Sequence, residues 1–183
     1  MNALLFQITW FACVIGSSQN VLWPGILSCI ALIVWQLSPK RRHPSDLSLV
    51  FTAIILGLII DTVWLQLNFI KFTSPWPAQS IAPAWIIMLW VSLALTINHS
   101  LNWLRQHPLL PALMGLIGAP LSYTAGAKLG AISYQTDTLL VCSSLGIAWA
   151  IALPLLYLIS TQKGHNKKTT ARHIVSNPDT QLH

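Results

Sequence analysis

The sequence is poor in charge, and above all in negative charge. Charged residues make up 8% of its 183 residues, and it contains no glutamate. Four acidic residues stand against ten lysines and arginines, which gives a net charge of +6. With 54% hydrophobic residues, the chain has too few charges to cover the surface of an ordinary soluble domain. Membrane topology and attraction to anionic lipid headgroups explain the positive excess, so we expect membrane lipids and no nucleic acid as partners.

Motifs that mark common catalytic and metal sites are also missing. Cys13, Cys29 and Cys142 are isolated within apolar runs and form neither a disulfide framework nor a metal motif. The sequence has no phosphate-cradling glycine-rich loop, no nucleophile elbow and no His-Glu-x-x-His helix. These absences argue against a familiar hydrolase or a nucleotide-driven pump, and we predict neither a metal nor a cofactor.

The sequence consists mainly of long apolar runs. About 20 apolar residues are needed to cross roughly 30 Å of hydrocarbon, and only helices or closed barrels satisfy the backbone there. The runs are continuous and not alternating, so we predict an all-α, polytopic integral membrane protein with about six transmembrane helices in a compact bundle. The expected transmembrane domain, residues 1–160, has spans at residues 3–18, 21–37, 47–70, 81–104, 109–132 and 139–160. Residues 161–183 are expected to be a basic, disordered tail.

Basic residues orient these spans. Lys40, Arg41 and Arg42 form the strongest cationic cluster between two apolar runs, and Arg105 lies in the turn after the fourth span. With six spans, these loops and both termini share one side, which the positive-inside rule places in the cytoplasm. Several of the nine tryptophans fit interfacial positions. A five-span alternative lays the first run flat on the interface and moves only the N-terminus.

Asp61 is the most unusual polar residue, because it lies inside the third span. An ionised carboxylate there costs roughly 3 kcal/mol, so the side chain is expected to face the bundle interior. It either handles a proton or a ligand, or is a structural group held by hydrogen bonds. Lys128, in the outer turns of the fifth span, is the first candidate for an ion pair with Asp61, although it could instead extend to the interface.

Further polar groups lie in the fourth and fifth spans. Asn98 and His99 fall toward the cytoplasmic end of the fourth span, where a lone histidine is more often a hydrogen-bonding strut than a ligand. Ser122 and Tyr123 follow Pro120, which frees a backbone carbonyl at mid-span for a hydroxyl, water or ligand, or bends the helix for packing. The candidate intramembrane polar site is therefore Asp61, Asn98, His99, Ser122, Tyr123 and Lys128.

Small residues recur at every fourth position of the fifth span. The stripe comprises Gly118, Ser122, Gly126 and Gly130. Small residues at this spacing let another backbone approach closely, which predicts helix packing either within the chain or with a second copy in a homo-oligomer.

Four segments carry a resemblance to a known family. LLFQITWFACVIG, LGLIIDTVWLQL, APAWIIMLWVSLALTINHSLNWL and GAPLSYTAGAKLGAISY are similar to the DUF2878 family of bacterial inner-membrane proteins, over nearly all of Met1 to Ile159. The resemblance implies a multi-pass protein of the bacterial inner (cytoplasmic) membrane with both termini cytoplasmic. Because that family is uncharacterised, it supplies no reaction, ligand or catalytic residue, although it favours a role linked to membrane lipids.

Three functions remain open. The first is an accessory or binding protein in which the third to fifth helices enclose a small polar cavity around Asp61, Tyr123 and Lys128. The second is a membrane-embedded enzyme acting on a lipid or other apolar substrate, with Asp61, His99 or Lys128 as acid and base. The third, a small transporter, lacks the expected internal repeats. Convergence of the polar residues on one cavity would favour chemistry, whereas scattered, individually satisfied groups would favour architecture.

Overall fold

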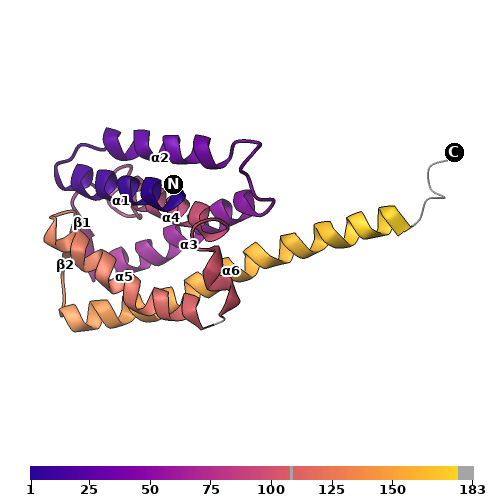
Figure 1. Cartoon of the computed structure of the whole chain (residues 1–183). Coiled ribbons are helices and arrows are strands. Elements are labelled where there is room, and N and C mark those ends of the chain that lie inside the picture. Colours follow the sequence, from indigo (N-terminus) through magenta and orange to yellow (C-terminus); the bar gives the residue numbers. More distant parts are fainter. Residues whose placement is uncertain (108, 177–183) are drawn as a thin grey trace.

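The computed structural model describes residues 1–107 and 109–176, and the chain is mainly helical throughout (Figure 1). The predicted all-α class is confirmed. The helices are α1 (Asn2–Ser18), α2 (Trp23–Gln36), α3 (Asp46–Gln66), α4 (Ala84–Ile97), α5 (Leu110–Lys128) and α6 (Thr138–Ser176), with a short 3-10 helix, η1 (Asn102–Gln106), between α4 and α5.

Only some of these helices have the length of a membrane span. In the described part of the chain, α3, α5 and residues 138–160 of α6 are long and apolar enough to cross a bilayer. The helices α1, α2 and α4 are apolar but have 17, 14 and 14 residues. At about 1.5 Å per residue, the two shortest reach only about 21 Å. The chain thus has the character of a membrane protein, with three helices of full spanning length.

The fourth predicted span, residues 81–104, is shorter than expected at both ends. Pro83 precedes α4 with an extended backbone (ψ 154°), which suits a residue outside the helix. The other end turns after Ile97, where the amides of His99 and Leu101 both donate to the Thr96 carbonyl. The helix therefore ends at Ile97, and the rest of the predicted span forms a turn and the beginning of η1.

A small sheet replaces the predicted ends of the third and fifth spans. Strand β1 (Ile70–Phe72) pairs antiparallel with β2 (Ile132–Tyr134), with Lys71 opposite Ser133. Two residues with positive φ precede the strands, Asn68 at 55° and Gly130 at 81°, and both end the preceding helix. The sequence pattern does not predict these strands, because apolar residues such as Phe69 and Ala131 lead directly into them.

The tail differs from its prediction as well. Helix α6 continues to Ser176 and projects beyond the other helices in Figure 1, so residues 161–176 of the expected tail belong to this helix. That stretch contains no proline and several good helix formers, so nothing prevents the helix of the last span from continuing. Residues 177–183 of the predicted tail lie outside the described residues.

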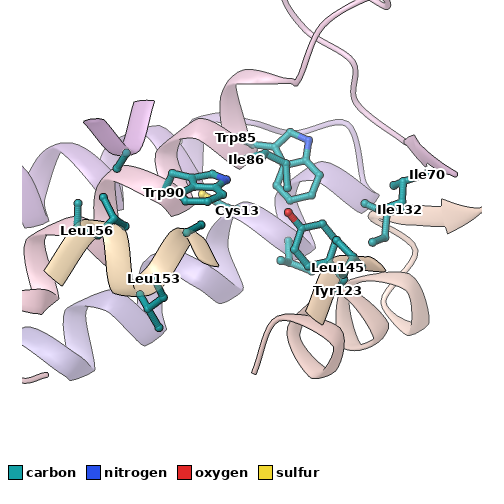
Figure 2. Close-up of a cluster of buried hydrophobic side chains, with 14 of the residues drawn as sticks. Cys13, Ile70, Trp85, Ile86, Trp90, Tyr123, Ile132, Leu145, Leu153 and Leu156 are labelled. Carbon is teal, nitrogen blue, oxygen red and sulfur yellow. The ribbon is translucent and has the colours of Figure 1, made fainter. Parts of the chain in front are cut away.

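Helix α4 is the centre of the fold. It packs against α1, α2, α3 and α6, and nine of its 14 residues are buried. Figure 2 shows buried side chains of α4, α5 and α6, among them Trp90, Tyr123 and Leu153, which belong to one hydrophobic cluster. A smaller cluster lies between α2 and α4, around Leu32 and Leu95.

Helices α5 and α6 pack with their backbones unusually close. A Cβ added at Gly115 would lie 2.2 Å from the Trp149 carbonyl oxygen, and one at Gly146 would lie 2.7 Å from the Leu116 oxygen. Pro120 has no N–H to donate to that Leu116 carbonyl. The carbonyl freed by the proline therefore faces the α5–α6 contact, as the packing interpretation of Pro120 requires.

Candidate functional site

Asp61 is completely buried, at 0% exposure, about one turn before the end of α3. One carboxylate oxygen accepts a hydrogen bond from Trp90 Nε1 at 2.7 Å, and the other accepts one from the Tyr123 hydroxyl. In Figure 2 the Tyr123 hydroxyl points away from α5 into the core. The carboxylate therefore joins α3 to α4 and α5 through two aromatic side chains.

Trp90 is held on three sides. Its ring stacks on Trp149 of α6 with centroids 4.1 Å apart, and its N–H is bound by Asp61. Gly57 lies one turn before Asp61, and a Cβ there would be 2.5 Å from Trp90 Cδ1. The spacing of Gly57 and Asp61 places both on one face of α3, so one provides space for the indole and the other accepts its hydrogen bond.

A cavity of about 430 Å³ lies on the other side of these aromatic rings, between α1, α4, α5 and α6. Trp90, Tyr123 and Trp149 line it, whereas Asp61 does not, so the rings separate the carboxylate from the cavity. Its other lining residues are Phe6, Gln7, Trp10, Ile86, Leu89, Leu93, Met114, Gly115, Gly118, Ala119, Leu121, Ser122 and Leu153.

The cavity opens at the surface of α5. Gly118 and Leu121 both line it and are both exposed. A Cβ added at Gly118 would meet nothing within 4 Å. Since α5 is one of the helices of full spanning length, the opening lies on a surface that would face the hydrocarbon of a bilayer.

Polar contacts in the cavity are few. Trp10 Nε1 donates to Ser122 Oγ at 2.9 Å, joining α1 to α5 across the cavity wall. Gln7 lies one turn before Trp10 and is exposed. The site therefore combines an apolar, aromatic lining with one hydroxyl and one amide.

A second polar cluster surrounds Asp46, at the beginning of α3. Asp46 is also fully buried, and its carboxylate accepts hydrogen bonds from the His43 backbone N–H at 2.8 Å and from Asn98 Nδ2 at 2.7 Å. His99 Nε2 lies 3.1 Å away and forms an ion pair when the ring is protonated. Burial lowers the pKa of His43, beside this cluster, below its ordinary value, against the opposing attraction of Asp46.

Hydrogen bonds extend this Asp46 network to most of the helices. Asn2 donates to Gln36 Oε1 at 2.6 Å, and Gln36 lies 2.8 Å from His99. Arg105 of η1 donates to Asn98 Oδ1 at 2.7 Å and to the Ser160 hydroxyl of α6. The network thus fixes α1, α2, α3, α4 and α6 relative to one another at one end of the molecule.

The predicted polar site therefore separates into two parts. Asp61 and Tyr123 are in contact, and Ser122 lies in the adjoining cavity. Asn98 and His99 belong to the Asp46 network, which lies 15 residues away along α3, or about 22 Å.

The hypothesis of an Asp61–Lys128 ion pair is wrong. Lys128 is exposed at the end of α5, and the one ion pair found in the described part of the chain joins His99 to Asp46. Both oxygens of Asp61 already accept hydrogen bonds from aromatic donors, so the carboxylate is satisfied without a cation.

The small-residue stripe of α5 does not form the close helix contact that its spacing predicted. Gly118 and Ser122 line the cavity, Gly130 ends the helix, and a Cβ added at Gly126 would lie 3.8 Å from the Ile132 side chain, in ordinary contact. The close contact with α6 is made by Gly115, on the neighbouring face. Sequence spacing showed that α5 has a face without large side chains, but not whether a helix or a cavity lies against it.

Sequence reasoning did not identify Asp46, Gln36 or Arg105 as a network. Asp46 follows Ser45 at the start of an apolar run. This pattern is typical of the beginning of a helix and could have identified Asp46 from the sequence. In the described residues, no group of three histidines, cysteines or acidic residues is placed to hold a metal.

Comparison with known proteins gives one match. Residues 1–155 match the model of a family described as a protein of unknown function, DUF2878. No curated protein and no solved structure matches the chain.

Proposed function

The chain belongs to the DUF2878 family, and from the geometry of its cavity we propose that it is a multi-pass membrane protein that binds an apolar molecule entering from the lipid. The observation that carries this proposal is the cavity of about 430 Å³ with its opening beside Gly118. Its volume falls within the roughly 300–1,000 Å³ of small-molecule sites, and its lining is apolar and aromatic with few polar groups, as in such sites.

The proposed topology places all six helices in the bacterial inner membrane. Helices α3, α5 and α6 cross it fully, and the shorter α1, α2 and α4 complete the bundle. The exposed Lys40, Arg41 and Arg42 face the cytoplasm together with both termini, in agreement with the positive-inside rule. Arg41 lies 3.5 Å above the ring of Trp35, an arrangement suited to the interfacial region.

Binding is favoured over chemistry by the positions of the titratable groups. Asp61 is separated from the cavity by Trp90 and Tyr123, and His99 belongs to a network about 22 Å away along α3. An enzyme acting on a bound lipid would need an acid or base in contact with its substrate. Each of these groups instead has its own hydrogen-bond partners, which supports an accessory or binding role.

The test is to fill the cavity and to identify what is lost. Gly118→Leu adds a side chain where there is open space, so the fold is expected to tolerate it. The matched control is Ser143→Leu, an exposed position of α6 that does not line the cavity. Each protein would be extracted with its surrounding lipid and studied by native mass spectrometry with identification of bound molecules.

We expect a defined molecule to copurify with the wild type and with Ser143→Leu. In Gly118→Leu its amount is expected to fall at least about tenfold, which corresponds to a loss of roughly 1.4 kcal/mol in binding free energy through steric exclusion. The same set of bound molecules in all three proteins, at equal thermal stability, would contradict a binding role for this cavity.

A further inference from the structure

The cavity contains no charge, and this restricts what it can hold. None of its 16 lining residues is charged, and the nearest buried carboxylate, Asp61, lies behind the aromatic wall. A charged headgroup placed there would lose its hydration without gaining a counter-charge, which is strongly unfavourable. The lining therefore selects against fatty-acid carboxylates, phosphates and amines inside the cavity.

Three polar groups of the lining remain able to hydrogen-bond an occupant: the side chains of Ser122 and Gln7, and the buried Nε1 of Trp149, which has no partner among the described residues. Ser122 Oγ accepts the Trp10 N–H at 2.9 Å, and its own hydrogen has no acceptor among the residues that the structure describes. Gln7, one turn from Trp10 on α1, likewise makes no hydrogen bond within the described chain. A hydroxyl and an amide can both donate to an oxygen, so they suit an uncharged hydroxyl or carbonyl group.

The lining of the cavity extends along α5, and its hydroxyl with a free hydrogen, that of Ser122, lies near one end of this stretch. On α5 its lining extends from Met114 to Tyr123, nine residues or about 13 Å along the helix. Ser122 is near the end closer to the β-sheet, whereas Met114 and Leu93 lie at the apolar end, toward the Asp46 network. An occupant with one polar end and one chain fits this distribution.

On these grounds we infer that the cavity binds an uncharged single-chain amphiphile, whose hydroxyl or carbonyl oxygen is hydrogen-bonded by Ser122 and whose chain lies along α5 toward Met114. This inference rests on the proposed function, because it names the chemical class of ligand for the same cavity. The exposed Gly118 and Leu121 mark the side from which the chain enters.

Brominated ten-carbon probes can test the inference, because bromine quenches tryptophan fluorescence and Trp90 and Trp149 line the cavity. The probes are 10-bromodecanol, 10-bromodecanoate, 10-bromodecylammonium and 1-bromodecane, added to the full-length protein in nanodiscs of uncharged phosphatidylcholine. The same titrations on Gly118→Leu measure quenching from the surrounding lipid, so the difference between the two proteins reports occupancy of the cavity.

We expect the alcohol to occupy the cavity at least about tenfold more tightly than either charged probe. Ser122→Ala is expected to weaken binding of the alcohol by about two- to tenfold, the range for one neutral hydrogen bond, and to leave binding of 1-bromodecane unchanged. Ser122→Thr keeps the hydroxyl and is expected to restore binding of the alcohol, which separates loss of the hydrogen bond from disturbance of the fold.

The two proposals fail in different ways. If every probe quenches Gly118→Leu as strongly as the wild type, the cavity is not a binding site and the proposed function is wrong. If the cavity is occupied but charged probes bind as well as the alcohol, or Ser122→Ala weakens all probes equally, the proposed function stands and the inference about an uncharged oxygen is overturned.

Discussion

The two buried carboxylates of α3 offer a comparison within a single helix. Asp46 and Asp61 are both 0% exposed and lie 15 residues apart. Asp46 accepts hydrogen bonds from a backbone N–H and an amide and lies 3.1 Å from the imidazole Nε2 of His99, whereas Asp61 accepts two hydrogen bonds, both from aromatic side chains. We therefore expect the number and kind of the donors, more than the burial itself, to decide how well the protein tolerates replacement of each carboxylate.

The largest expected effect is that of Asp46→Asn. One oxygen of Asp46 accepts a hydrogen bond from the His43 backbone N–H and lies beside His99 Nε2. The other oxygen accepts a hydrogen bond from the Asn98 side-chain amide. An asparagine would direct its own NH₂ at a donor, and Asn98 cannot rotate its amide to compensate, because its oxygen binds Arg105. We expect a loss of about 2–3 kcal/mol in the free energy of unfolding, as for a buried donor left unsatisfied.

Asp61→Asn is the matched comparison. Its oxygen can still accept from Trp90, and its NH₂ can donate to the hydroxyl oxygen of Tyr123, whose own hydrogen then loses the Asp61 acceptor. Because the hydroxyl can rotate and no N–H is forced against another donor, the loss is expected to be about 1 kcal/mol, smaller than for Asp46→Asn. Both variants would be unfolded by denaturant in the same mixed micelles. Equal losses, or a greater loss for Asp61→Asn, would show that the donor count does not distinguish the two sites.

An effect between those of the two carboxylate variants is expected for Gly57→Ala, which tests the packing around Asp61. The added Cβ would lie 2.5 Å from Trp90 Cδ1, and the ring cannot move freely because it is stacked on Trp149 and bound to Asp61. We expect a destabilisation of about 1–3 kcal/mol, measured by denaturant unfolding, as for an overpacked core.

Gly118→Ala is the control for Gly57→Ala. It makes the same change in a spanning helix where the added Cβ meets nothing within 4 Å, so it is expected to be neutral or to stabilise by up to about 1 kcal/mol. Equal destabilisation by both alanines would attribute the effect to the helix backbone and not to the Trp90 contact.

The smallest expected effect concerns pH, at the end of the molecule that contains Asp46. Burial lowers the pKa of His43 in the folded protein below its ordinary 6.5. As the pH falls through 6.5, the unfolded chain therefore binds the proton first, and the stability that is present above this pH is progressively lost.

His43→Gln is expected to flatten this part of the curve of thermal midpoint against pH, between about pH 8 and about pH 5. The exposed His107 supplies the control, since His107→Gln removes a histidine that is more exposed than the partly buried His43. An unchanged slope in His43→Gln would show that other groups cause the acid sensitivity of this end.

The comparison also shows how far sequence reasoning reached. Asp61 was recognised because a carboxylate in an apolar run is costly unless it faces the protein interior. Asp46 was missed because it stands next to a charged loop, where an acidic residue is ordinary. Ion pairing with Lys128 was predicted from charge alone, whereas the N–H of Trp90 and the hydroxyl of Tyr123 satisfy Asp61 without a cation.

The sequence by itself determined the helical membrane character of the chain, its family and the inward orientation of Asp61, because composition and the cost of burying charge act locally along the chain. Only the tertiary structure decided that Asp61 binds Trp90 and Tyr123, which are 29 and 62 residues away. It also decided that Gly118 faces a cavity whereas Gly115 faces a helix, and that Asp46 organises a network. These outcomes depend on which helix faces meet, and contacts between distant segments are set by the packing of the whole bundle.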